Sequence, residues 1–79
     1  MLLKLELFGA VSERFPQGEG ERSFEDGVTP EEIVAWLDLK DGDQFVVLVN
    51  GQPVATEDRD RPVLTEGDLV TVFPPMEGG

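Results

Sequence analysis

One stretch of the chain has the spacing of a short amphipathic helix, and strand-like segments lie on both sides of it. Thr29 is a favourable N-cap, Pro30 suits the first helical position, and Glu32 completes a capping box. The apolar stripe that follows consists of Ile33, Trp36 and Leu37. This spacing predicts a helix from residue 30 to about residue 39, with Trp36 in the core or partly in it.

Patterns typical of strands occupy most of the remaining chain. Residues 45–49 are continuously apolar, which is typical of a strand in the middle of a sheet. Asn50-Gly51 is a strong hairpin signal, and Pro53 places the short return strand at a sheet edge. The predicted strands cover residues 2–8, 21–25, 45–49, 52–55 and 69–73, and residues 10–15 are long enough for a turn of helix.

The order strand, strand, helix, strand, short strand, strand predicts an α+β fold. A mixed sheet of four to five strands around one main helix, the ubiquitin-like β-grasp arrangement, fits this order with short connections. In that arrangement the first and last strands lie side by side in the centre of the sheet. We therefore expect a β-grasp domain at residues 1–73 and an extended tail at residues 74–79 that leaves from a rigid base.

Composition excludes most kinds of catalytic site. The chain has 79 residues, which is enough for one small domain, and it has neither cysteine nor histidine. It therefore lacks a thiol nucleophile, a thiolate metal site and the usual general base, and we expect no metal site. No apolar stretch approaches the length of a membrane span, and no signal peptide is evident, so we expect a soluble cytoplasmic protein.

The net charge is strongly negative. Six Lys and Arg against seventeen Asp and Glu give a formal net charge of −11. Such a surface repels a phosphate backbone, which excludes nucleic acid as a partner. The acidity either keeps a small domain soluble or steers it toward a basic partner, and its even distribution along the chain favours solubility.

The last residues of the sequence are the strongest candidates for chemistry. Gly78-Gly79 follow a predicted strand without a linker, and Pro74 and Pro75 stiffen the connection. The carboxylate of Gly79 is the candidate reactive group, although a disordered terminus without function is the alternative. The apolar residues around the tail are either core or a surface held by a partner, and the sequence leaves both possibilities open for Phe8, Phe73 and Met76.

Other motifs are weak. Gly18-Glu19-Gly20 begins a phosphate-loop pattern, and residues 38–43 resemble a calcium loop, but neither has the complete set of residues. Both are interpreted as turns. The charged run at residues 58–61, within a predicted exposed loop at 56–62, is either a docking patch or a solvated loop. Its alternating charge favours the solvated loop.

Four segments carry a resemblance to a known family. Residues 73–79, the turn at 64–68 and residues 7–13 resemble MoaD, the small subunit of molybdopterin synthase. Residues 45–54, around Asn50-Gly51, are more similar to ThiS, the thiamine sulfur carrier. The chain is thus identified as a member of the ubiquitin-like β-grasp sulfur carriers, and the Pro-Pro-x-x-Gly-Gly tail favours the MoaD branch.

The resemblance implies a carrier protein rather than an enzyme. In this family an E1-like enzyme uses ATP to adenylate the terminal glycine, and a persulfide then converts it to a thiocarboxylate that donates sulfur. Carried onto this chain, Gly79 is the reactive residue and Gly78 allows the tail to thread into a narrow active site. The residues implied in partner binding are Phe8, Phe73, Pro74, Pro75, Met76 and Glu77. The chain itself would bind no cofactor, since the partner enzyme uses the ATP and the sulfur donor.

The resemblance also implies partners and leaves alternatives. The expected partners are an E1-like adenylating enzyme of the MoaB, MoeB or ThiF type and the large subunit of molybdopterin synthase, or an equivalent sulfur acceptor. Molybdopterin biosynthesis, for a molybdenum or tungsten cofactor, is the favoured pathway. The alternatives are thiamine or another thiolation pathway, a ubiquitin-like modifier conjugated to lysines through Gly79, and an interaction domain with an inert tail.

Overall fold

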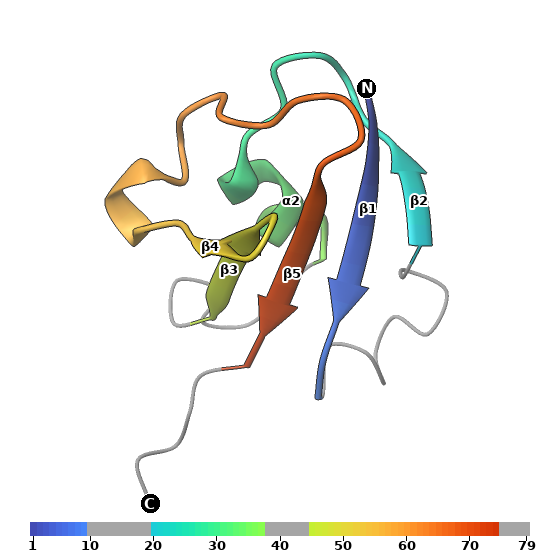
Figure 1. Cartoon of the computed structure of the whole chain (residues 1–79). Coiled ribbons are helices and arrows are strands. Elements are labelled where there is room, and N and C mark those ends of the chain that lie inside the picture. Colours follow the sequence, from blue (N-terminus) through green and yellow to red (C-terminus); the bar gives the residue numbers. More distant parts are fainter. Residues whose placement is uncertain (10–19, 38–44, 75–79) are drawn as a thin grey trace, which may run out of the picture.

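In the part of the chain that the structure describes, a mixed β-sheet has a helix packed against one of its faces (Figure 1). The computed structural model describes residues 1–9, 20–37 and 45–74. Within these residues the elements are β1 (Leu2–Leu7), β2 (Gly20–Ser23), α2 (Pro30–Trp36), β3 (Val46–Val49), β4 (Gln52–Pro53), the 3-10 helix η2 (Thr56–Asp58) and β5 (Leu69–Phe73). Each predicted strand is present: β5 has the predicted bounds, and the bounds of the others differ from the prediction by at most two residues.

The strand order in the sheet is β2-β1-β5-β3-β4. β1 and β5 pair in parallel, with Leu5 opposite Val70 and Leu7 opposite Val72. The other three pairs are antiparallel. This topology confirms the β-grasp fold and the prediction that the first and last strands lie side by side at the centre of the sheet.

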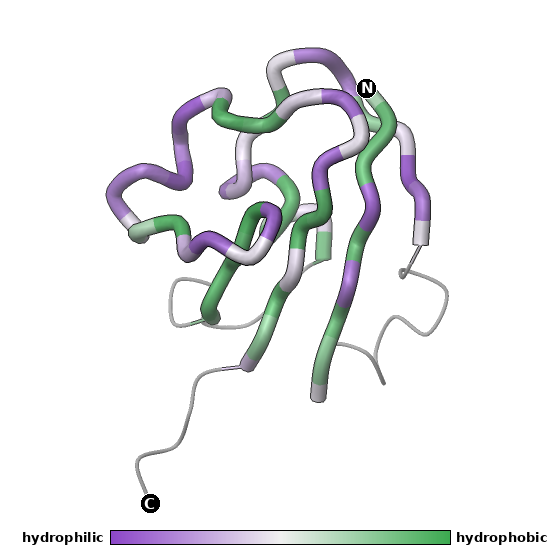
Figure 2. Tube along the Cα trace, viewed as in Figure 1, coloured by the Kyte–Doolittle hydropathy of each residue, from purple (hydrophilic) through white to green (hydrophobic). Residues whose placement is uncertain are grey.

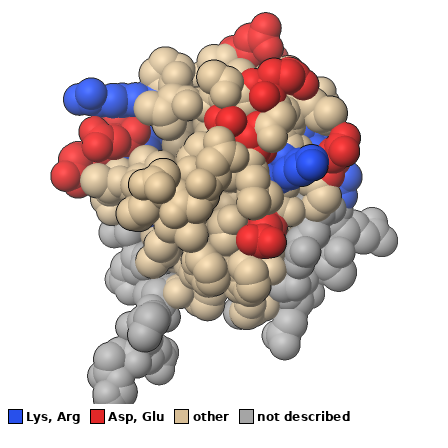
Figure 3. Space-filling view, in the orientation of Figure 1, with Lys and Arg blue, Asp and Glu red and all other residues tan. Residues whose placement is uncertain are grey.

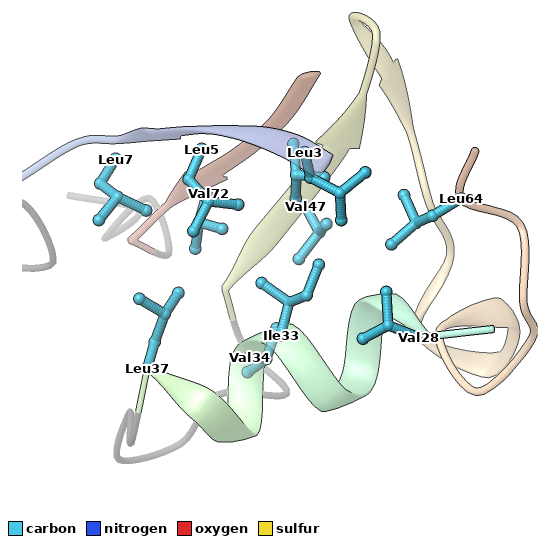
Figure 4. Packing of buried hydrophobic residues seen from close by; sticks show 11 residues of the cluster. Leu3, Leu5, Leu7, Val28, Ile33, Val34, Leu37, Val47, Leu64 and Val72 are labelled. Atoms are coloured by element: carbon cyan, nitrogen blue, oxygen red, sulfur yellow. The ribbon is translucent and has the colours of Figure 1, made fainter. Parts of the chain in front are cut away.

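The core lies between the sheet and α2. Alternate residues of β1 and β5 point toward the helix, as the period of two in these strands requires, and Figure 4 shows their side chains facing it. The buried apolar residues are Leu3, Leu5, Leu7, Val28, Ile33, Val34, Leu37, Val47, Leu64, Val70 and Val72. Hydrophobic residues concentrate along these strands and hydrophilic ones in the connecting segments (Figure 2). Burial of each large side chain stabilises the fold by about 1.5–3 kcal/mol.

The start of α2 follows the predicted capping box. The Thr29 hydroxyl accepts from the Glu32 backbone N–H at 3.1 Å, and the Glu32 carboxylate accepts from the Thr29 N–H at 3.2 Å. The helix ends at Trp36, with Leu37 as its C-cap, so the prediction of an end near residue 39 was wrong. Residues 38–44 lie outside the described part of the chain.

The buried stripe of the helix matches the prediction at two of its three residues. Ile33, Val34 and Leu37 are buried, whereas Trp36 is 44% exposed. At 100° per residue the buried residues centre between Ile33 and Val34, which leaves Trp36 at the edge of the stripe. Its ring packs edge-to-face on Phe24, with centroids 5.4 Å apart. The expectation that Trp36 belongs to the core was therefore wrong.

The hairpin after β3 forms as predicted. Asn50 and Gly51 have φ values of +51° and +82°, the positive angles that a type I′ turn requires at both central positions. β4 is the edge strand, in agreement with the presence of Pro53. β3 lies between β5 and β4, so it is paired on both sides, but α2 covers only one face and Val46 is 40% exposed on the other.

The loop at residues 56–62 differs from the prediction at one residue. Arg59 is only 2% exposed, and its guanidinium donates to the carbonyl oxygen of Phe45, just before β3. The Arg59 carbonyl accepts from the Glu31 N–H in the first turn of α2, at 2.8 Å. The interpretation of the charged run as solvated was wrong for Arg59, because its side chain joins the loop to the residue before β3 and its backbone carbonyl joins the loop to the helix.

Several predictions fall on segments outside the described residues. They are the helical turn at 10–15, the glycine-rich turn at 18–19, the acidic turn at 38–43 and the tail after Pro74. Within the described residues, no helix has the length and apolar character needed to cross a membrane.

Candidate functional site at the end of the central strands

β1 and β5 end side by side at the same end of the sheet, and the predicted tail begins there (Figure 1). Phe8 follows β1 directly and Phe73 is the last residue of β5. The Phe8 N–H donates to the Val72 carbonyl at 3.2 Å, which extends the parallel pairing by one residue. The central strand pair therefore holds the chain rigidly up to the residue before Pro74.

Phe8 and Phe73 form a stacked aromatic pair. Their ring centroids are 4.6 Å apart and the ring planes differ by 10°. Because Leu7 and Val72 point into the core, Phe8 and Phe73 face the opposite side of the sheet. Phe8 is 40% exposed and Phe73 is half-buried. The sequence left open whether these rings are core or surface, and the structure places them on the surface.

Val46 extends this apolar surface. It lies opposite Phe73 in the β3–β5 register and faces the same side of the sheet. We refer to Phe8, Phe73 and Val46 as the aromatic patch. Val46 was not predicted as a site residue, although the continuously apolar run at residues 45–49 is a signal that both faces of this strand are apolar. Figure 3 shows that the lower middle of this face, where the central strands end, carries few charged side chains.

One carboxylate lies beside the aromatic patch. Thr71 is 3% exposed, and its hydroxyl donates to the Glu6 carboxylate at 3.2 Å. Glu6 lies opposite Thr71 in the β1–β5 register, two residues before the aromatic pair and on the same face of the sheet. The outer face of the sheet thus carries the aromatic patch and, beside it, the Glu6 carboxylate, which the Thr71 hydroxyl holds in place.

The hydrogen-bond pairing between β1 and β5 stops at Pro74. Along this parallel pair, the Lys4 N–H donates to the Asp68 carbonyl at 2.9 Å and the Phe8 N–H donates to that of Val72. If this pattern continued, the next hydrogen bond would run from the N–H of residue 74 to the Phe8 carbonyl oxygen. Proline has no N–H, so the pairing ends at this position and the chain leaves the sheet.

Gly9 lies against Pro74. Its φ is +64°, and a Cβ built on it would come within 2.9 Å of the Pro74 Cγ and 3.3 Å of the Cδ. Real Cβ atoms essentially never approach other atoms to 2.9 Å. The half-buried ring of Pro74 therefore occupies space that is available only because residue 9 has no side chain.

The other end of β5 is held by polar groups. The Asp68 carboxylate accepts from the Thr65 N–H at 2.8 Å and from the Asn50 amide at 2.9 Å, and the Asn50 amide oxygen accepts from the Leu69 N–H at 2.9 Å. The Thr65 backbone N–H, followed by the Asn50 side chain, holds the pKa of Asp68 below its usual value of 3.8. We refer to these residues as the Asn50–Asp68 network.

The structure thus brings together three of the predicted site residues: Phe8, Phe73 and Pro74. Pro75, Met76, Glu77, Gly78 and Gly79 lie outside the described residues. In the part of the chain that the structure describes, no group of three or more Asp or Glu side chains is arranged to hold a metal ion. Gly9 and Val46 are the site residues that sequence reasoning missed.

Comparison with protein families and curated sequences gives one match and one negative result. The model of the ThiS family matches residues 5–79. No curated protein sequence matches the chain.

Several solved structures share the fold. The HVO 2177 protein of Haloferax volcanii, known from a solution structure, has a TM-score of 0.82 and 29% identity, over 100% of this chain and 87% of that one. Small archaeal modifier protein 1 of H. volcanii has a TM-score of 0.73 and 20% identity, over 95% of this chain and 98% of the other. A putative molybdopterin converting factor, subunit 1, from Pyrococcus furiosus has a TM-score of 0.71 and 23% identity, over 96% and 99%. At such identities the last two similarities show the fold alone.

Proposed function

The chain belongs to the ThiS family, and from that premise we propose that it is a sulfur carrier that reacts through the carboxylate of Gly79. An E1-like enzyme adenylates this carboxylate, and sulfur transfer then yields a thiocarboxylate. The carrier donates this sulfur in the cytoplasm to a second partner. It is a substrate of these enzymes and carries out no catalysis of its own.

In the proposed chemistry this chain contributes only the carboxylate of Gly79. A Gly79 carboxylate oxygen attacks the α-phosphorus of ATP, pyrophosphate leaves, and the acyl carbon becomes electrophilic. The terminal sulfur of a persulfide attacks that carbon and AMP leaves. A second thiol then attacks the donor's sulfur in the resulting S–S bond and forms a disulfide with it, and the thiocarboxylate on Gly79 is the leaving group. The partner supplies every catalytic group, so the absence of Cys and His in this chain is compatible with its role.

The observation that carries the proposal is the way in which the central strand ends. β5 is paired on both sides up to Phe73, and the pairing with β1 stops at Pro74. Pro74, the first residue of the predicted tail, is thereby held at a fixed place beside the aromatic patch. We infer that the patch contacts the partner while Gly78 and Gly79 enter its active site, where the lack of a Cβ suits a narrow channel.

We further propose molybdopterin biosynthesis as the pathway. The Pro74-Pro75 pair ahead of Gly78-Gly79 supports this assignment, together with the fold shared with a putative molybdopterin converting factor subunit. The second partner is then the large subunit of molybdopterin synthase. In a thiamine or other thiolation pathway the same Gly79 chemistry would serve a different acceptor.

Intact-protein mass spectrometry tests the proposed function. The chain is incubated with ATP, Mg²⁺, a persulfide donor and the E1-like enzyme of its own organism. We expect a mass increase that corresponds to replacement of one oxygen by sulfur. Deletion of Gly79 should abolish this increase while the unfolding temperature stays nearly unchanged.

The same experiment separates the alternatives. Conjugates between the chain and lysines of other proteins would indicate a modifier instead of a sulfur carrier. An unchanged mass, with an enzyme that converts another carrier in the same assay, would refute the proposed function. Addition of purified large subunit and the sulfur-free pterin precursor then tests the pathway, since only a molybdopterin carrier should lose its sulfur to them.

A further inference from the structure

We propose that Gly9 is a positioning residue for the tail: its bare Cα seats the Pro74 ring and thereby sets the direction in which the chain leaves the sheet. This inference rests on the proposed function, because the benefit of a fixed direction is delivery of Gly79 to the partner. Gly9 itself touches no reacting atom. It acts through Pro74, which is far from it in sequence and packed against it in the fold.

The space around Gly9 distinguishes it from the other glycines with positive φ. A Cβ at Gly9 would meet the Cγ, Cδ and Cβ of Pro74 at 2.9, 3.3 and 4.0 Å. A Cβ at Gly20, Gly27, Gly51 or Gly67 would meet nothing within 4 Å. Their positive φ angles alone explain those four glycines. Gly9 satisfies a second requirement, which is contact with the first residue of the tail.

Covalent neighbours hold this contact in place. Phe8 precedes Gly9 and Phe73 precedes Pro74, and their rings stack on the outer face with centroids 4.6 Å apart. The Phe8 N–H also remains bonded to the Val72 carbonyl. A side chain at residue 9 therefore cannot be accommodated by a shift of β1 without loss of the ring stack or the hydrogen bond. The Pro74 ring, which has no ladder bond, is the part that moves.

The first experiment compares Gly9→Ala with the matched control Gly27→Ala. Both place a Cβ at a positive φ, and both should lower the unfolding temperature by a similar amount, roughly 4–8 °C. Only Gly9→Ala displaces Pro74. We expect kcat for thiocarboxylate formation to fall roughly 10- to 100-fold in Gly9→Ala with little change in KM, because the partner still binds the sheet face but receives a misdirected tail. Equal kcat values in the two variants would overturn the inference.

A second experiment removes the atoms that a Cβ at residue 9 would strike. Pro74→Ala lacks the Cγ and Cδ. In this background we add either Gly9→Ala or the control Gly27→Ala. The two additions should lower kcat by the same factor. A merely structural role for Gly9 predicts that the losses from Gly9→Ala and Pro74→Ala multiply. Independent, multiplicative effects would therefore refute the positioning role.

A nuclear Overhauser measurement decides the structural part without any partner enzyme. The Gly9 Hα protons should show cross-peaks to the Pro74 ring protons in the unmodified protein and in Gly27→Ala. These cross-peaks should weaken or disappear in Gly9→Ala. Their absence from the unmodified protein overturns the inference whether or not the chain carries sulfur, whereas failure of the unmodified protein to gain sulfur counts against the proposed function alone.

Discussion

The two ends of β5 are held by different kinds of interaction. At the start of the strand, the Asn50–Asp68 network fixes Leu69 through directional hydrogen bonds of 2.8–2.9 Å. At the end, main-chain pairing with β1 and β3 is supplemented by an aromatic stack and by a proline ring that lies on a glycine. Hydrogen bonds fix a register because they tolerate little displacement, whereas exposed apolar side chains suit a surface that another protein covers. Polar side chains thus hold the strand at its start, and apolar side chains surround it at its end.

The largest effect on folding stability is expected at the start of β5. Asn50→Ala removes two side-chain hydrogen bonds and places an unfavourable residue at a φ of +51°. We expect the free energy of unfolding to fall by about 2–3 kcal/mol. Urea denaturation measures this change, and Gln52→Ala is the control, because Gln52 is an exposed amide in the same hairpin. Equal losses in the two variants would show that the network does not fix the strand.

At the end of β5 the stability effect should be smaller and the partner effect larger. Phe73→Ala should lower the free energy of unfolding by about 1–2 kcal/mol, because the ring is only half-buried. A double-mutant cycle with Phe8→Ala should give a coupling of about 0.5–1.5 kcal/mol for the stack. Calorimetric titration with the E1-like partner should show roughly tenfold weaker binding for Phe73→Ala. Unchanged binding would show that Phe73 does not contribute to contact with the partner.

The two ends should also respond differently to pH. The folded-state pKa of Asp68 lies below its usual value of 3.8. Its ionised carboxylate therefore stabilises the folded state at pH values above the unfolded-state pKa. This stabilisation is lost as pH falls through the folded-state pKa. The difference in unfolding free energy between the unmodified protein and Asp68→Asn should therefore shrink as pH falls below about 4. Phe73→Ala should show no such pH-dependent difference. Thermal unfolding across this range, at constant ionic strength, measures both.

The smallest expected effect concerns the net charge of −11. If the acidity steers the carrier toward a basic partner, its association rate should fall as salt concentration rises, while the dissociation rate changes little. Stopped-flow measurement at two salt concentrations gives both rates. A flat salt dependence would assign the acidity to solubility and leave recognition to the aromatic patch.

Local patterns in the sequence predicted most of the fold. The alternation in β1, the capping box at Thr29 and the Asn50-Gly51 turn depend on neighbouring residues, and each is present in the structure. The order of these elements then led to the central pairing of β1 with β5. The exposure of Trp36 was not predicted, because a difference of one residue in the buried stripe of a two-turn helix depends on how α2 packs against the sheet.

The less predictable features join residues that are distant in sequence. Arg59 lies in a run of alternating charge that is typical of a solvated loop, and its burial depends on the positions of Phe45 and α2. The contact between Gly9 and Pro74 depends on the register of two strands at opposite ends of the chain. The sequence led to a prediction for the tail residues, but not for the glycine against which Pro74 packs.

The central position of β5 has a consequence for folding. Its partners β1 and β3 precede it in the chain, and its pairing with β1 closes a loop of most of the described sequence. Such non-local pairing slows folding, since loop closure costs entropy before contacts compensate it. On the ribosome, β1 and β3 would have no strand between them until residues 69–73 emerge. Among the described residues, the sheet is therefore completed only late in synthesis, once β5 is available to pair with both of its neighbours.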